Sequence, residues 1–134
     1  MLGTLRARAM RMGAKHFKDL AAWQLANELH NLLNAVLNTS AASRHLRFCD
    51  QVRAASISVA SNIAEGFKRF KPREFAQFLR YARGSLAELS SQLEQLKTLN
   101  IGTREDHEAI SLLIARCSIA TARLQSYLRR CKRR

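Results

Sequence analysis

One stripe of apolar residues, between positions 75 and 96, constrains the fold of this chain more than any other feature. Its members follow one another in alternating steps of four and three residues: Phe75, Leu79, Ala82, Leu86, Leu89, Leu93 and Leu96. This heptad spacing places all of them on one face of an α-helix and is typical of helices that pack side by side. Pro72 suits the first turn of such a helix, because proline has no N–H to leave unpaired there. The pattern therefore predicts a helix from Pro72 to about Leu99, with a stop at 100–102.

Three further segments repeat the helical spacing, and no segment sustains the alternation of a β-strand. The first, about Leu20–Leu37, has its apolar stripe at Ala22, Leu25, Leu29, Leu32 and Val36, widened on one flank by Trp23, Leu33 and Leu37. The second, about Leu46–Phe70, has one stripe of Phe48, Val52, Ala55, Val59, Ile63 and Phe67 and a second set of Ala54, Ile57, Ala60 and Ala64. The last follows Gly102 and has its stripe at Ile110, Ile114, Cys117, Thr121, Leu124 and Leu128, with Leu112 and Ile119 off it. At its start, Thr103 and Asp106 resemble a capping box.

Four helices with short connections predict an all-α fold, an antiparallel up-down four-helix bundle. Only one Pro and five Gly occur among 134 residues, too few turn residues for an all-β domain. We expect the bundle to span residues 16–128, with a flexible basic tail at 1–15 and a second basic tail at 129–134. The second apolar set at 54–64 exceeds what one bundle buries, so we expect it to serve as a subunit interface.

Two polar residues and two glycines interrupt the apolar helices, and we interpret them as a structural polar core: Asn62, Glu65, Gly66 and Gly84. If the helices hinge at Lys71, Ser58 opposes Gly84 and Asn62 opposes Arg80. We expect Asn62 to hydrogen-bond the neighbouring helix and Glu65 to reach Arg80 or Arg83. Glycine in a helix interior costs about 1 kcal/mol relative to alanine, so close packing is expected at both glycines. The functional alternative makes Asn62 and Glu65 part of a binding cleft.

No constellation of reactive groups points to catalysis. The four His have no His or Cys partner at ligand spacing, and neither a Gly-rich phosphate loop nor a nucleophile elbow is present. Three Cys without a CxxC pair indicate neither a zinc site nor disulfides, and they fit a reducing compartment. No apolar run reaches the length of a membrane span. We therefore expect no enzymatic activity, no cofactor, no metal and no membrane association, in a cytoplasmic protein.

The net charge is the most unusual feature of the composition. Lys and Arg total 23 against 10 Asp and Glu, so the formal net charge is +13. A charge of this size attracts polyanions over long range. The cations that we select as a nucleic-acid contact are Lys68, Arg69, Lys71, Arg73, Arg80, Arg83, Arg129, Arg130, Lys132 and Arg133. In an antiparallel bundle the 68–73 turn and the C-terminal cations share one end, and Glu94, Glu105, Asp106 and Glu108 lie at the other.

This cationic end suits contacts to a phosphate backbone, which give affinity without sequence readout. Three aromatic residues lie near it, Phe67, Phe70 and Tyr81, and they either stack on bases or pack in the core. Two alternatives remain for the charges: they hold an acidic protein or a polymerase, or they only keep the chain soluble.

Three separated blocks resemble the bacterial four-helix bundle protein family, which includes proteins encoded in intervening sequences of 23S ribosomal RNA genes. The blocks are FKDLAAWQLA at 17–26, SNIAEGFKR at 61–69 and REFAQFLRYARGSLAELSSQL at 73–93. The resemblance covers about residues 16–128, and it departs from the family at Ala60, where a proline is usual. It implies an up-down four-helix bundle, often assembled as a ring-like homopentamer, and it brings no catalytic residues.

A related group, the accessory variability determinants of diversity-generating retroelements, is similar in fold. Its members form basic pentamers that bind nucleic acid and a reverse transcriptase. By this analogy of fold, together with the charge, we expect a non-enzymatic homo-oligomer that binds nucleic acid, with RNA favoured. The alternative is a protein–protein adaptor or scaffold without a direct nucleic-acid role.

Overall fold

The computed structural model describes residues 13–132, with Lys132 described by its backbone only. This range holds four α-helices, α2 (Ala21–Leu37), α3 (Leu46–Phe67), α4 (Pro72–Thr98) and α5 (Arg104–Lys132), and two short 3-10 helices, η1 (Phe17–Asp19) and η2 (Ala42–Arg44). No β-strand occurs in it, so the all-α prediction is confirmed. Residues 1–12 of the predicted tail at 1–15 and residues 133–134 of the predicted tail at 129–134 lie outside the described residues.

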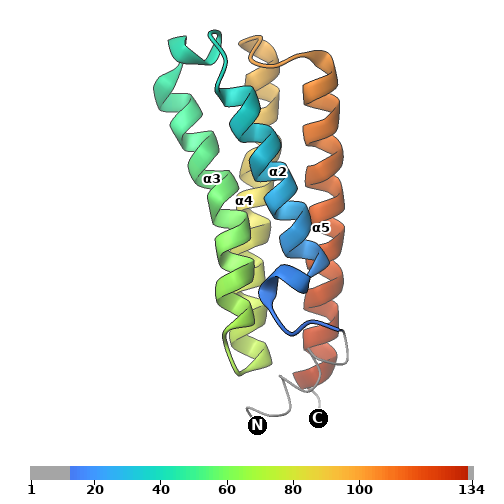
Figure 1. Ribbon diagram of the computed structural model, residues 1–134. Coiled ribbons are helices and arrows are strands. Elements are labelled where there is room, and N and C mark those ends of the chain that lie inside the picture. Colours follow the sequence, from blue (N-terminus) through green and yellow to red (C-terminus); the bar gives the residue numbers. More distant parts are fainter. Residues whose placement is uncertain (1–12, 133–134) are drawn as a thin grey trace.

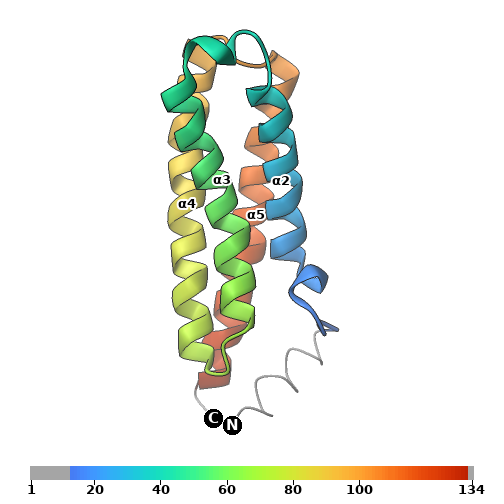
Figure 2. The ribbon, with the colours of Figure 1, turned by 60° about the vertical axis from the view of Figure 1, so that its left-hand side comes forward.

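The four helices lie side by side along one long axis (Figure 1). The connection between α3 and α4 is at one end of the bundle, together with the last turns of α5, and the other two connections are at the opposite end. Figure 2 shows the same arrangement from another side. At the first end, α5 continues to Lys132, so the expected C-terminal tail begins as helix.

The predicted stripes of α4 and α5 form the centre of the core. All seven members of the α4 stripe are buried, and so are all six members of the α5 stripe. In α2 the predicted stripe is buried at Ala22, Leu29 and Val36, and Leu33 and Leu37 on its flank are buried with it. Leu25 and Leu32 are only half-buried, and Ala26 is buried in addition. The reason is that α2 packs against both α3 and α5, so its buried face is wider than one stripe.

Local chemistry explains where the helices begin and end. The Thr103 hydroxyl accepts the Asp106 N–H at 3.1 Å and the Asp106 carboxylate accepts the Thr103 N–H at 2.9 Å, which confirms the capping box. Asn100 and Gly102 have φ of 55° and 89°, the left-handed conformation that ends α4. Helix α3 ends at Phe67, three residues before the predicted Phe70.

The early end of α3 follows from two backbone hydrogen bonds that span three residues instead of the four of an α-helix, and from Pro72. The N–H of Lys68 bonds Glu65 O at 3.2 Å and that of Arg69 bonds Gly66 O at 3.0 Å, so the chain tightens after Gly66. Lys71 is extended, with ψ of 129°. The ring of Pro72 disfavours a helical conformation for the residue before it, which separates α3 from α4.

The expected polar links between α3 and α4 are partly wrong. The two helices do meet at Ser58, but its partner is the Ser85 hydroxyl at 2.8 Å, one residue beyond Gly84. Asn62 donates within α3, to Ser58 O at 2.8 Å, and not to a neighbouring helix. Glu65 is half-exposed and pairs with Arg69 at 2.9 Å, not with Arg80 or Arg83. Asn62 and Glu65 therefore stabilise α3 and its end locally.

The two helical glycines differ. Gly66 is buried, and a Cβ atom there would lie 2.6 Å from Phe75 Cδ1 and 3.0 Å from Phe78 Cβ, so the expectation of close packing is confirmed. Gly84 is exposed, and no atom lies within 4 Å of its Cβ position. The expectation that Gly84 permits close packing inside the chain is therefore wrong.

The buried thiol of Cys117 makes the stability of the fold sensitive to alkaline pH. Burial raises the pKa of Cys117 from 9.0 to about 11, against a smaller opposite effect of its hydrogen bond with Thr121. The folded chain thus keeps a proton on Cys117 that the unfolded chain loses near pH 9. The contribution of this protonated thiol to the free energy of unfolding is therefore present below pH 9 and lost as pH rises through about 11. We expect the free energy of unfolding, measured with urea from pH 8 to pH 11, to fall more steeply in the parent than in Cys117→Ala. Equal slopes would contradict this account.

Candidate nucleic-acid interface

The exposed cations of the α3–α4 turn and of the α5 terminus lie at the same end of the bundle (Figures 1 and 2). We call this region the basic end and define it by Lys68, Lys71, Arg73, Arg129 and Arg130, all of which are exposed. The two sequence clusters share this end of the bundle, although about 60 residues separate them in the sequence. Lys132 belongs to the same end by its backbone.

Two of the selected arginines are occupied by contacts within the chain. Arg69 donates to Glu65 at 2.9 Å, and its guanidinium lies over the Phe78 ring, 4.8 Å from the centroid. Arg83 donates to the Gln125 amide oxygen at 2.7 Å and thereby links α4 to α5. These two side chains hold the bundle together, and the sequence pattern could not separate them from the free cations.

The remaining selected cations on α4 and the turn face solvent. Lys68, Lys71, Arg73 and Arg80 are exposed, and none forms an ion pair within residues 13–132. An exposed cation without a carboxylate partner can bind a phosphate directly, because no ion pair has to be broken first. These four residues, with Arg129 and Arg130, make up the part of the prediction that the geometry favours most.

The aromatic residues near the basic end have two different environments. Phe67 packs edge-on against Phe75, with 6.3 Å between ring centroids, so it belongs to the core. Phe70 and Tyr81 are exposed. The Tyr81 hydroxyl accepts a hydrogen bond from Gln77 at 2.9 Å, and its ring packs edge-on against Phe78. Tyr81 is thus an aromatic surface, fixed in place and adjacent in sequence to Arg80.

The opposite end is less acidic than expected from the sequence. Glu94 pairs with Lys97 at 3.2 Å and Glu108 pairs with Arg104 at 3.3 Å, while Asp106 caps α5. Arg44 and Arg47 are also exposed there. Exposed pairs of this kind neutralise the local field, so the electrostatic asymmetry of the bundle comes mainly from the basic end.

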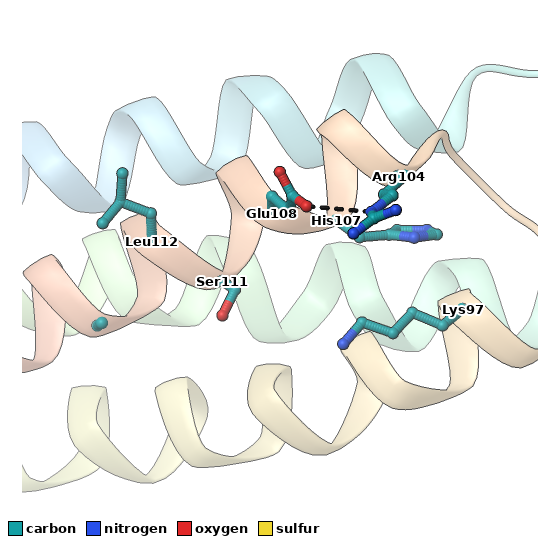
Figure 3. Close-up of a pocket in the computed structure, with 7 residues that line it drawn as sticks. Lys97, Arg104, His107, Glu108, Ser111 and Leu112 are labelled. Carbon is teal, nitrogen blue, oxygen red and sulfur yellow. Dashed lines mark hydrogen bonds and ion pairs between the residues drawn. The ribbon is translucent and has the colours of Figure 1, made fainter.

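A shallow hollow of about 550 Å³ lies beside α5 near this opposite end (Figure 3). Lys97 of α4 and six residues of α5 line it: Arg104, His107, Glu108, Ser111, Leu112 and Ala115. His107 Nε2 is already engaged with Ile101 O at 2.7 Å, and Arg104 with Glu108. The sequence pattern did not predict this hollow, although Leu112, outside the predicted stripe of α5, was a signal for it.

Neither a metal site nor a membrane span is found in the part of the chain that the structure describes. Within residues 13–132, no three His, Cys, Asp or Glu side chains are grouped so that they could hold a metal ion. Among the helices of the same range, none combines the length and the apolar character needed to cross a bilayer.

The family model described as 23S rRNA-intervening sequence protein matches residues 18–122, which is most of the chain. A search of curated proteins finds no match. The matched range runs from just before α2 into α5 and includes the turn at 68–71.

Proposed function

The chain belongs to the family of 23S rRNA-intervening sequence proteins, and we propose that it is a non-enzymatic protein that binds RNA at the basic end. The observation that carries this proposal is the convergence of Lys68, Lys71 and Arg73 with the end of α5 at one tip of the bundle. A net charge of +13 adds long-range attraction for phosphate. Tyr81 offers an exposed ring on which an unpaired base can stack.

We also propose that the antiparallel up-down bundle assembles into a homo-oligomeric ring, with a pentamer as the expected form. The second apolar set of α3 supports assembly, because Ala54 and Ile57 are exposed and Ala60 and Ala64 are only half-buried. Leu46, at the start of the same helix, is exposed as well. Apolar side chains gathered on one helix face are typical of subunit contacts. The molar mass in solution, measured by light scattering, gives the number of subunits.

A triple substitution at the basic end is expected to weaken RNA binding. In Lys68→Ala/Lys71→Ala/Arg73→Ala, the affinity for a single-stranded RNA should fall, and the slope of log K against log salt should decrease by about 0.7 for each phosphate that the protein no longer neutralises. The measurement is fluorescence anisotropy of labelled RNA at several salt concentrations. All three residues are exposed, so the fold should be unaffected.

The matched control removes the same charge from the opposite end, in Arg44→Ala/Arg47→Ala/Arg104→Ala. These three arginines are exposed as well. Both triples lower the net charge equally, so any difference between them reports position and not total charge. An equal loss of affinity in the two triples, or no loss in either, would refute the assignment of the basic end.

The adaptor alternative uses the same basic end to hold an acidic protein. Purification of the chain from cells before and after nuclease digestion separates the two possibilities. Proteins that leave after digestion were held through nucleic acid, whereas proteins that remain bind directly. Retention of a partner together with no affinity for purified RNA would favour the adaptor.

A further inference from the structure

Helix α5 carries a second apolar stripe on the side opposite the core. Its two large members are Leu112, 59% exposed, and Ile119, 53% exposed, one heptad apart. Small residues continue the steps of three and four, and we call the whole set the outer seam: Leu112, Ala115, Ile119, Ala122 and Ser126. The core stripe of α5 is fully buried, so the outer seam is surplus to the packing of the bundle.

Two open hollows lie along the outer seam. The hollow of Figure 3 reaches Leu112 and Ala115. A second hollow of about 480 Å³ follows along the same helix and is lined by Ile119, Ala122, Arg123, Ser126 and Arg130. Ala115 and Ala122 have small side chains next to the larger Leu112 and Ile119, which leaves room for the side chains of a second helix packed on this face.

A row of arginines runs beside the outer seam. Arg116, Arg123 and Arg130 are exposed and one heptad apart, and none forms an ion pair within residues 13–132. If Leu112 and Ile119 are taken as a positions and the alanines as d positions, all three arginines occupy e positions. Charges at e and g select the partner of a paired helix. A matching helix therefore needs apolar a and d residues and carboxylates beside them.

A second copy of this face does not meet that requirement. The g positions of α5 are Ser111, Ser118 and the buried Gln125, so none of them offers a carboxylate and two copies would set arginine against arginine or against neutral residues. Each copy also brings a charge of +13. Nucleic acid would use the arginines but gain little from exposed Leu112 and Ile119. The combination of an apolar seam and a cationic edge fits an acidic amphipathic helix.

We propose that the outer seam binds an acidic amphipathic helix of a partner protein. The apolar stripe of that helix packs on Leu112 and Ile119, and its carboxylates pair with Arg116, Arg123 and Arg130. This surface is separate from the turn at 68–71, so the proposal does not depend on RNA binding. Arg130 belongs to both regions and is left unchanged in the test.

The test uses the full chain and a synthetic peptide of three heptads, with Leu at a and d and Glu at e and g. A second peptide with Lys in place of Glu is the charge control. Binding is measured by fluorescence anisotropy and located by NMR shift mapping. We expect the Glu peptide alone to bind, with shifts centred on Leu112 to Ser126. Binding of the Lys peptide with equal affinity, no binding of the Glu peptide, or shifts centred on the 68–73 turn would overturn the proposal.

Two double variants examine the seam. Leu112→Gln/Ile119→Gln removes the apolar contacts and Arg116→Gln/Arg123→Gln removes the charges, and each should weaken peptide binding about tenfold. The matched control of the charge variant is Arg44→Gln/Arg47→Gln, which removes two exposed arginines at the end of the bundle where α3 begins. Glutamine is a good helix former and all these sites are exposed, so folding should be retained, as circular dichroism will report.

Three results with these variants would overturn the proposal. An equal loss of peptide binding in the control of the charge variant would show general attraction to a cationic protein. A change of molar mass in Leu112→Gln/Ile119→Gln would show that another copy covers the seam. A loss of RNA affinity in that same variant would show that the seam belongs to a nucleic-acid site.

Discussion

Replacing Leu86 by alanine is expected to lower the free energy of unfolding by about 2–5 kcal/mol. Leu86 is 1% exposed and lies in the middle of the α4 stripe, between Ala82 and Leu89, which are buried as well. Removal of its side chain leaves a cavity in a close-packed core that can collapse only in part. Urea denaturation followed by circular dichroism measures the change.

The matched control is Leu112→Ala, the same change of chemistry on the opposite side of α5 from the core. Because Leu112 is more than half exposed, its truncation should change the free energy of unfolding by less than about 0.5 kcal/mol. Similar losses at Leu86 and Leu112 would mean that α4 or α5 is rotated about its axis relative to the structure.

Replacing Gly66 by alanine is expected to destabilise the fold by about 1–3 kcal/mol, although alanine is the better helix former. The added Cβ would lie 2.6 Å from the ring of Phe75 and 3.0 Å from Phe78 Cβ. Neither atom is the free end of a flexible side chain, since Phe75 is buried against Phe67 and Cβ is fixed to the backbone of α4. The helices would have to separate, which urea denaturation would detect.

Gly84→Ala is the opposite case in the adjacent helix. Nothing lies within 4 Å of the position of its Cβ, so the substitution should stabilise α4 by up to about 1 kcal/mol. The same replacement is thus expected to have opposite signs at two sites on facing helices. A neutral Gly66→Ala would refute the close approach of α3 and α4 at that level.

The fold was predictable from the sequence wherever one regular pattern decided it. The stripes of α4 and α5 were assigned correctly at every position, because a helix packed at an unbroken heptad buries every member of it. The capping box at Thr103 and the first turn at Pro72 were also correct, since both depend on residues close in sequence.

Other features could not be predicted because they depend on neighbours in space. The partner of Ser58 on α4 was missed by one residue. Asn62 bonded within α3 and Glu65 paired with Arg69 just after its end, because each of these two residues had an equally good local partner. At Gly84, the cost of a glycine inside a helix led to the prediction of a close contact, which the structure does not have. At the candidate site, the cations could be selected from the sequence. Only the structure shows that Arg69 and Arg83 are bonded to other side chains, unlike the remaining described cations of the site.

The position of Arg69 has a consequence for any ligand of the α3–α4 turn. Its guanidinium is held between Glu65 and the Phe78 ring, which ties the turn to both helices. The backbone that carries Lys68 and Lys71 is therefore ordered during folding, and its conformational entropy is not lost again when a ligand binds. Preorganisation of this kind strengthens association without adding any new interaction. Loosening the turn would weaken binding even if every lysine were kept.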